Sequence, residues 1–93
     1  MGFQFDEHKS RSNKKKHGID FIAAQELWRG FSVEFKACSE FENRYAMIGE
    51  VGGRIYTCIY CYREDDVRLI SCRRVRKGEK KLYEQSKERA GYR

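Results

Sequence analysis

Arginine and tyrosine side chains supply the chemistry that this chain of 93 residues could perform on a polyanion. The candidates, which end or follow its longest apolar stretch, are Arg63, Arg68, Arg73, Arg74 and Tyr83. An arginine fork holds phosphate oxygens through paired hydrogen bonds, and a tyrosine can stack on a base or transfer a proton. A concave sheet face lined in this way could hold single-stranded RNA and position a ribose 2′-hydroxyl for attack on its own phosphate without a metal ion. The alternative is that the arginines are surface cations and that Tyr83 anchors a weakly amphipathic helix.

Other kinds of chemistry lack their residue patterns. The glycines at positions 49, 52 and 53 fit a hairpin better than a phosphate-binding loop. His8 and His17 stand alone, without the spacing of a metalloprotease helix, and no serine lies in a nucleophile elbow. Most metal-dependent and acyl-transfer chemistry is therefore excluded, and we expect no cofactor.

Cysteines could form disulfides or a zinc site in a chain of this size. The four are Cys38, Cys58, Cys61 and Cys72. No apolar leader follows Met1, which favours the reducing cytosol and argues against disulfides. Cys58 and Cys61 lie in a run of β-branched and aromatic residues, and strand residues three apart point to opposite faces. We therefore expect free, packed thiols without a bound metal, and the alternative is a zinc-stabilised interaction domain.

The length and the charge distribution limit the function further. A chain of 93 residues can build one modest core, and we expect a single domain over residues 1–93. The net charge is +6, and both ends are basic: residues 1–18 carry five Lys and Arg against two acids, and residues 73–93 carry nine against three. This pattern favours a polyanionic partner, with nucleic acid first and an anionic membrane surface second. The alternative is a solvated basic surface that binds nothing specific. No apolar run approaches the roughly 18 residues of a membrane span, so we expect that the chain does not cross a membrane. Because no apolar leader follows Met1, we expect a cytoplasmic protein, and a membrane is not among its expected partners.

Hydrophobic spacing and capping residues predict an α+β fold. Asp6 and Gly18 bound a polar surface helix over residues 7–16, and Asp20 caps a second helix over 21–28 with an apolar stripe. Four strands are predicted over 31–38, 44–50, 55–62 and 67–73, followed by a charged helix over 77–89. The expected architecture is two N-terminal helices, a four-stranded antiparallel sheet with the 55–62 strand in the centre, and a C-terminal helix. Residues 3–5 alternate and are interpreted as an edge strand or a docking segment.

Six separated blocks of the sequence follow one another at defined spacings. They are Phe3-x-Phe5-Asp6, Lys9 with Asn13, Lys16-His17-Gly18-Ile19-x-Phe21-x-x-Ala24, Arg44-x-x-x-Ile48-Gly49, Tyr60-Cys61-Tyr62-Arg63, and Arg68-x-Ile70-Ser71-x-Arg73 with Glu79-x-x-x-Tyr83. In this order they resemble the BrnT family of small ribonuclease toxins, over about residues 3 to 83. Three positions differ from the family pattern: Cys61 replaces the usual Thr, Cys72 the usual Ala, and Val75 a usual small residue.

The resemblance implies a RelE-like fold, which agrees with the architecture expected from the residues. It implies a type II toxin that cleaves RNA without a metal ion and inhibits translation and growth. A BrnA-like antitoxin would neutralise it, as a heterotetramer with dimeric antitoxin, and would contact the operator DNA. The alternative is a non-catalytic basic module that binds nucleic acid.

The resemblance also implies roles for individual residues. Arg63, Arg73 and Tyr83 match the family's catalytic face by position, and Lys16 and His17 match it too. Together with Arg68 and Arg74, Lys16 and His17 are interpreted as RNA-binding residues, although Lys16-His17-Gly18 is also a typical helix end. The general base stays open between His17, Glu79 and Tyr83.

Overall fold

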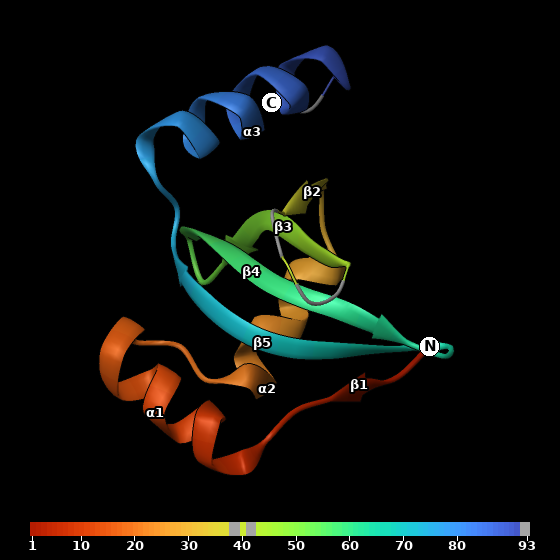
Figure 1. Cartoon of the computed structure of the whole chain (residues 1–93). Coiled ribbons are helices and arrows are strands. Elements are labelled where there is room, and N and C mark those ends of the chain that lie inside the picture. Colours follow the sequence, from red (N-terminus) through yellow and green to blue (C-terminus); the bar gives the residue numbers. More distant parts are fainter. Residues whose placement is uncertain (38–39, 41–42, 92–93) are drawn as a thin grey trace.

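The chain forms a five-stranded sheet with helices on both of its sides (Figure 1). The computed structural model describes residues 1–37, 40 and 43–91. Its elements are β1 (Phe3–Gln4), α1 (Glu7–His17), α2 (Phe21–Ala24), the 3-10 helix η1 (Gln25–Trp28), β2 (Ser32–Ala37), β3 (Arg44–Val51), β4 (Arg54–Arg63), β5 (Asp66–Arg74) and α3 (Lys77–Arg89). This order confirms the predicted α+β fold. Among the described residues, no helix is long and apolar enough to cross a membrane.

Strand order in the sheet is β1-β5-β4-β3-β2. Strands β2 to β5 form an antiparallel meander, and β4 lies at its centre, as its apolar residues on both faces predict. Gly52 and Gly53 turn the chain from β3 into β4 with φ angles of 59° and 80°. Both values are positive, as the tightest hairpin turns require, so the prediction of a glycine hairpin is confirmed.

The sheet has one strand more than the four that were predicted. β1 pairs in parallel with β5, with Phe3 opposite Val67. The carboxylate of Asp66 holds this edge, because it accepts hydrogen bonds from the backbone N–H of Gly2 (2.9 Å) and the side-chain amide of Gln4 (2.9 Å). A strand of two residues has no measurable periodicity, which is why the sequence left it open between an edge strand and a docking segment.

The main core lies between the sheet and the α2–η1 segment. Phe21, Ala24 and Leu27 are buried there and Trp28 packs partly buried against the same core, which confirms the apolar stripe predicted for residues 21–28. The second half of that helix is a 3-10 helix. β3 passes closely beneath it at Gly49, where an added Cβ would lie 2.7 Å from a methyl group of Leu27. Any side chain at this position would force the Leu27 side chain to shift, so glycine suits the close approach of the helix to the sheet.

α1 docks on the sheet through polar side chains instead of an apolar stripe. Asn13 is buried and donates to the backbone carbonyls of Ile19 (2.8 Å) and Cys72 (2.7 Å). Its side-chain carbonyl accepts the backbone N–H of Cys72 at 3.1 Å. Ser10, also buried, accepts the backbone N–H of Phe21 at 2.9 Å. α1 is thus a surface helix, as predicted, but two polar side chains fix it to β5 and to the start of α2.

Three cysteines are free and buried within the described part of the chain, and Cys38 lies outside it. Cys58 and Cys72 lie opposite each other on β4 and β5 and belong to the main core. A hydrogen bond to Cys72, followed by burial, raises the pKa of the Cys58 thiol. Cys61 is three residues further along β4 and so faces the other side of the sheet. These three thiols cannot converge on one metal ion, and the absence of bound zinc stays a prediction.

Replacement of Asn13 by Ala is expected to lower the free energy of unfolding by about 2–4 kcal/mol, because it leaves three buried backbone groups without partners. Urea unfolding followed by circular dichroism measures this loss. Ser12→Ala is the matched control, because Ser12 is exposed on the same helix. A loss below about 1 kcal/mol for Asn13→Ala would show that α1 is held by other contacts.

Candidate active site

A single carboxylate connects the sheet to the C-terminal helix. Glu79, in the first turn of α3, accepts from both terminal nitrogens of Arg73, at 2.8 and 2.9 Å. It also accepts the hydroxyl of Thr57 at 3.0 Å and the backbone N–H of Arg76 at 2.9 Å. We call Arg73, Glu79 and Thr57 the Glu79 clamp. Its arginine holds a planar anion in two-point geometry, which is the way arginine also holds phosphate.

A bulge in β5 directs Arg73 to this side of the sheet. Arg63 pairs with Asp66, but the pairing shifts by one residue between Ile59 and Tyr60 of β4. Without this shift Arg73 would lie opposite Tyr56, whose side chain belongs to the main core. With it, Arg73 lies opposite Thr57, on the other face. A one-residue shift exchanges the two faces of a strand, so the bulge makes the clamp possible.

The clamp changes the proton affinity of both partners. The hydrogen bonds from Arg73 are the main reason why the pKa of Glu79 falls from 4.5 to about 2, against the opposing effect of burial. The same contact raises the pKa of Arg73 above its usual value. Both side chains are only 19% exposed. Glu79 is therefore a fully charged carboxylate at neutral pH and a weak proton acceptor in this conformation.

Tyr83 lies one turn after Glu79 and is only 3% exposed. Its ring packs against Phe31 with the centroids 5.6 Å apart, and the ammonium of Lys87 lies 5.7 Å from its centroid. Burial is the main cause of its raised pKa, so the hydroxyl is protonated at neutral pH. In this conformation Tyr83 anchors α3, which was the structural alternative considered for it. A role in proton transfer requires that α3 moves away from Phe31.

Arg63 and Arg68 lie on the same face of the sheet as Arg73 but closer to its other end. Arg63 is six residues along β4 from Thr57, the partner of Arg73, which corresponds to about 20 Å. Strand side chains stand roughly perpendicular to their sheet, so Arg63 and Arg73 do not share one phosphate. Arg68 pairs with Cys61 and lies between them. The three arginines therefore form a row along one face instead of a single cluster.

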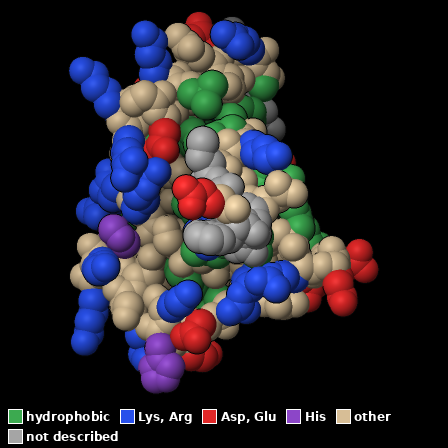
Figure 2. Space-filling model, in the orientation of Figure 1, with side chains coloured by type: hydrophobic (Ala, Val, Ile, Leu, Met, Phe, Trp, Pro, Cys, Tyr) green, Lys and Arg blue, Asp and Glu red, His purple; other side chains and the backbone are tan. Residues whose placement is uncertain are grey.

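Lys16, His17 and Arg74 lie at a different place, along an edge of the molecule. Lys16 and His17 form the exposed end of α1, while the Arg74 guanidinium lies 5.8 Å from the centroid of the Tyr56 ring. Figure 2 shows Lys and Arg side chains gathered on the side of the molecule where, in Figure 1, α1 ends and β5 leads into α3. The predicted RNA-binding residues thus occupy two surfaces, the arginine row and this basic edge.

A cluster of tyrosines on the core side of the sheet was not predicted from the sequence. The hydroxyl of Tyr60 donates to the carboxylate of Glu34, and that of Tyr62 donates to it at 2.7 Å. Burial, more than the Glu34 contact, raises the pKa of Tyr60. The pattern of alternating tyrosines in β4 could have indicated this cluster, but its acceptor lies on β2, two strands away. Thr57 was missed too, because a threonine in an apolar strand gives no signal of its own.

Comparison with known protein families identifies the family of this chain. A family described as "Ribonuclease toxin, BrnT, of type II toxin-antitoxin system" matches residues 5–79. The chain belongs to the BrnT family. The matched residues include Arg63, Arg68, Arg73 and Glu79, and end before Tyr83. No curated protein matches this BrnT chain.

The low pKa of Glu79 predicts how stability depends on pH. The folded pKa is about 2 and the ordinary value is 4.5, so the clamp stabilises the fold fully above pH 4.5 and loses its effect as the pH falls through about 2. Across this pH range we expect the free energy of unfolding of the parent to fall by about 2 kcal/mol more than that of Glu79→Gln. This is less than the full pKa shift of Glu79 implies, because the ion pair is partly exposed to solvent.

Urea unfolding at several pH values between 2 and 6 measures this difference, and Glu84→Gln, an exposed change on the same helix, is the control. Parallel pH curves for the parent and Glu79→Gln would contradict the role given to the clamp.

Proposed function

We propose that this BrnT protein is a metal-independent endoribonuclease that acts on the α3 side of its sheet and is neutralised by a BrnA-like antitoxin. The observation that carries the proposal is the Arg73 fork, which holds a carboxylate at two points on the face that also bears Arg63 and Arg68. A phosphate diester presents the same pair of oxygens to such a fork. Family membership supports the reaction class, and the charge of the chain supports a polyanionic substrate.

The proposed reaction uses the RNA as its own nucleophile. The ribose 2′-oxygen attacks the adjacent phosphorus and its proton passes to a base, while the bond to the 5′-oxygen breaks and that oxygen takes up a proton. The products are a 2′,3′-cyclic phosphate and a 5′-hydroxyl end. Negative charge grows on the phosphate oxygens, and a fixed guanidinium stabilises that charge in the transition state.

Arg73 contacts the scissile phosphate in this proposal, and Arg63 contacts a phosphate further along the strand. The separation of about 20 Å along the sheet is the reason for dividing the roles. Arg73 is assigned to the scissile phosphate because Glu79, a candidate base, is hydrogen-bonded to it. The hydroxyl of Thr57 is hydrogen-bonded to the same carboxylate. Arg68 lies between the two arginines, and Lys16, His17 and Arg74 extend the basic surface at the edge of the molecule.

Substrate binding also supplies the base in this scheme. A phosphate that takes the Arg73 fork displaces the carboxylate of Glu79, and the contact that holds the pKa of Glu79 at about 2 is lost. A freed carboxylate beside the phosphate has an ordinary pKa and accepts a proton more readily. His17 is the other non-tyrosine candidate for the base, but it lies on the basic edge at the end of α1, apart from the Arg73 fork, so Glu79 is the base in this scheme. Tyr83 is protonated and buried here, so it fits a donor to the 5′-oxygen once α3 has moved.

The reaction class can be tested with a labelled mixed-sequence RNA and purified protein. We expect cleavage in the presence of excess chelator, with cyclic phosphate ends, and no cleavage of the same sequence carrying 2′-O-methyl groups. These results follow because the 2′-hydroxyl, and not a metal-bound water, is the proposed nucleophile. Tight binding of both RNAs without cleavage of either would favour the non-catalytic binding module instead.

The division between Arg73 and Arg63 predicts different kinetic effects. Arg73→Lys keeps the charge but loses the fork, and we expect kcat to fall by ~10²-fold, the usual effect of removing a transition-state donor. Arg63→Ala should raise KM with little change in kcat, because a flanking phosphate is held equally before and during reaction. Glu79→Gln should bind RNA and lose kcat if Glu79 is the base.

Lys81→Ala is the control, since Lys81 is exposed on α3 without a partner among the described residues. Circular dichroism establishes folding before any rate is compared. Parent-like rates for folded Arg73→Lys and Arg63→Ala would place the active site elsewhere.

A further inference from the structure

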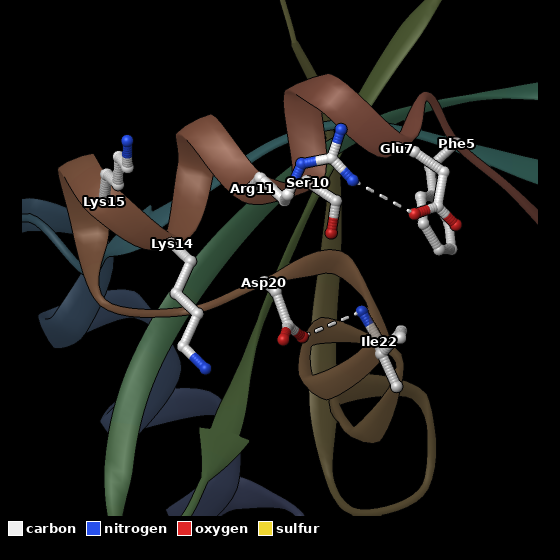
Figure 3. Close-up of a pocket in the computed structure, with 8 residues that line it drawn as sticks. All are labelled: Phe5, Glu7, Ser10, Arg11, Lys14, Lys15, Asp20 and Ile22. Atoms are coloured by element: carbon white, nitrogen blue, oxygen red, sulfur yellow. Dashed lines mark hydrogen bonds and ion pairs between the residues drawn. The ribbon is translucent and has the colours of Figure 1, made fainter.

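We propose that the groove between α1 and the start of α2 is an anchoring site for an acidic segment of the antitoxin that carries a bulky aliphatic side chain. The groove has a volume of about 420 Å³ and lies between the basic face of α1 and the first turn of α2 (Figure 3). The proposal rests on the proposed function only in taking the partner to be the antitoxin, since a type II family implies one.

An unusually exposed aliphatic side chain forms one end of the groove. Ile22 is 67% exposed although it lies in the first turn of a helix that packs on the core. Asp20 fixes that turn, because its carboxylate accepts the backbone N–H groups of Ile22 (3.0 Å) and Ala23 (2.8 Å). Phe5 lines the same end, and its ring packs edge-to-face on Phe21 at 5.8 Å. The apolar end is thus a firm surface that an inserted aliphatic group could bury.

The polar rim of the groove presents positive charge. Its two acids are already engaged, because Glu7 forms an ion pair with Arg11 at 3.6 Å and Asp20 caps α2. Lys14 and Lys15 also line it, and neither has a partner in the part of the chain that the structure describes. Figure 3 shows Lys14 and Lys15 on the side of the view away from Phe5 and Ile22. A ligand that fills the groove therefore needs an apolar group at one end and carboxylates at the other.

A protein segment satisfies this pattern better than RNA does. Ile22 has neither a hydrogen-bonding group for a base edge nor an aromatic face for stacking, and Phe5 already packs against Phe21. The groove also lies with α1 and α2, whereas the Glu79 clamp faces α3 on the other side of the sheet (Figure 1). An antitoxin anchored here leaves its remaining length to cover the arginine row.

The test is the affinity of purified toxin for the antitoxin protein of its own operon, measured by isothermal titration calorimetry. We expect Ile22→Glu to weaken binding by at least 10-fold and Ile22→Leu to bind like the parent. Leu82→Glu is the matched control, because Leu82 is an exposed aliphatic residue, at 40%, on α3. Lys14→Glu with Lys15→Glu should weaken binding more than Lys80→Glu with Lys81→Glu, which makes the same change in net charge on α3.

Two results would overturn the anchoring site. One is parent-like antitoxin affinity for folded Ile22→Glu, or an equal loss for Leu82→Glu. The other is weaker RNA binding by Ile22→Glu with unchanged antitoxin affinity, which would assign the groove to RNA. Failure of the proposed function gives a different result, since a parent protein that binds the antitoxin but cleaves no RNA leaves the anchoring site standing.

Discussion

The one-residue bulge in β5 is the constraint on which the candidate site depends. A strand has two faces, and the hairpin that joins Arg63 to Asp66 would by itself direct Arg73 to the main core. The shift between Ile59 and Tyr60 turns the end of β5 over, so that Arg73 meets Thr57 and Glu79. The main core still keeps Cys72, Leu69 and Val67, on either side of the bulge. One extra residue therefore lets the same strand pack a core and aim an arginine at α3.

Much of the fold could be predicted because the apolar spacing of α2 and of the strands is strong and both N-terminal helices begin at a capping aspartate. Asp6, Asp20 and the two hairpin glycines each act within a few residues, and the structure confirms each of them. The docking of α1 could not be predicted in this way. Asn13 acts on the backbone of Cys72, 59 residues away, and an asparagine in a polar helix has no property that marks it as buried. Long-range polar contacts leave no periodic trace in a sequence.

The candidate site could be predicted by residue type but not by arrangement. The arginines and Tyr83 were identified, yet the row of arginines along the sheet follows from strand register. Their distance could be predicted, because a turn at 64–65 and the number of residues in each strand place Arg63 and Arg73 far apart along the sheet. Their common face could not be predicted, because it depends on the bulge. The sequence does not identify Glu79 as the partner of Arg73, because a glutamate in the first turn of a helix is common and needs no arginine to explain it. Its capping contact with Arg76 and its clamp contact with Arg73 use the same carboxylate.

That shared carboxylate joins the stability of α3 to the proposed reaction. Glu79 holds α3 to the sheet through Arg73 and Thr57, and the contact of Tyr83 with Phe31 is a second anchor. In the proposed reaction, phosphate and Glu79 compete for one arginine fork, so RNA binds in full only where the clamp has opened. The apparent affinity for RNA is then the intrinsic affinity reduced by the fraction of open molecules. Opening the clamp also removes the carboxylate that holds the Arg73 guanidinium, so in the proposed reaction the bound phosphate has to fix that group for the transition state. In this scheme the ion pair therefore restrains RNA binding, and its opening releases the Glu79 carboxylate as a base, because phosphate and carboxylate use the same guanidinium.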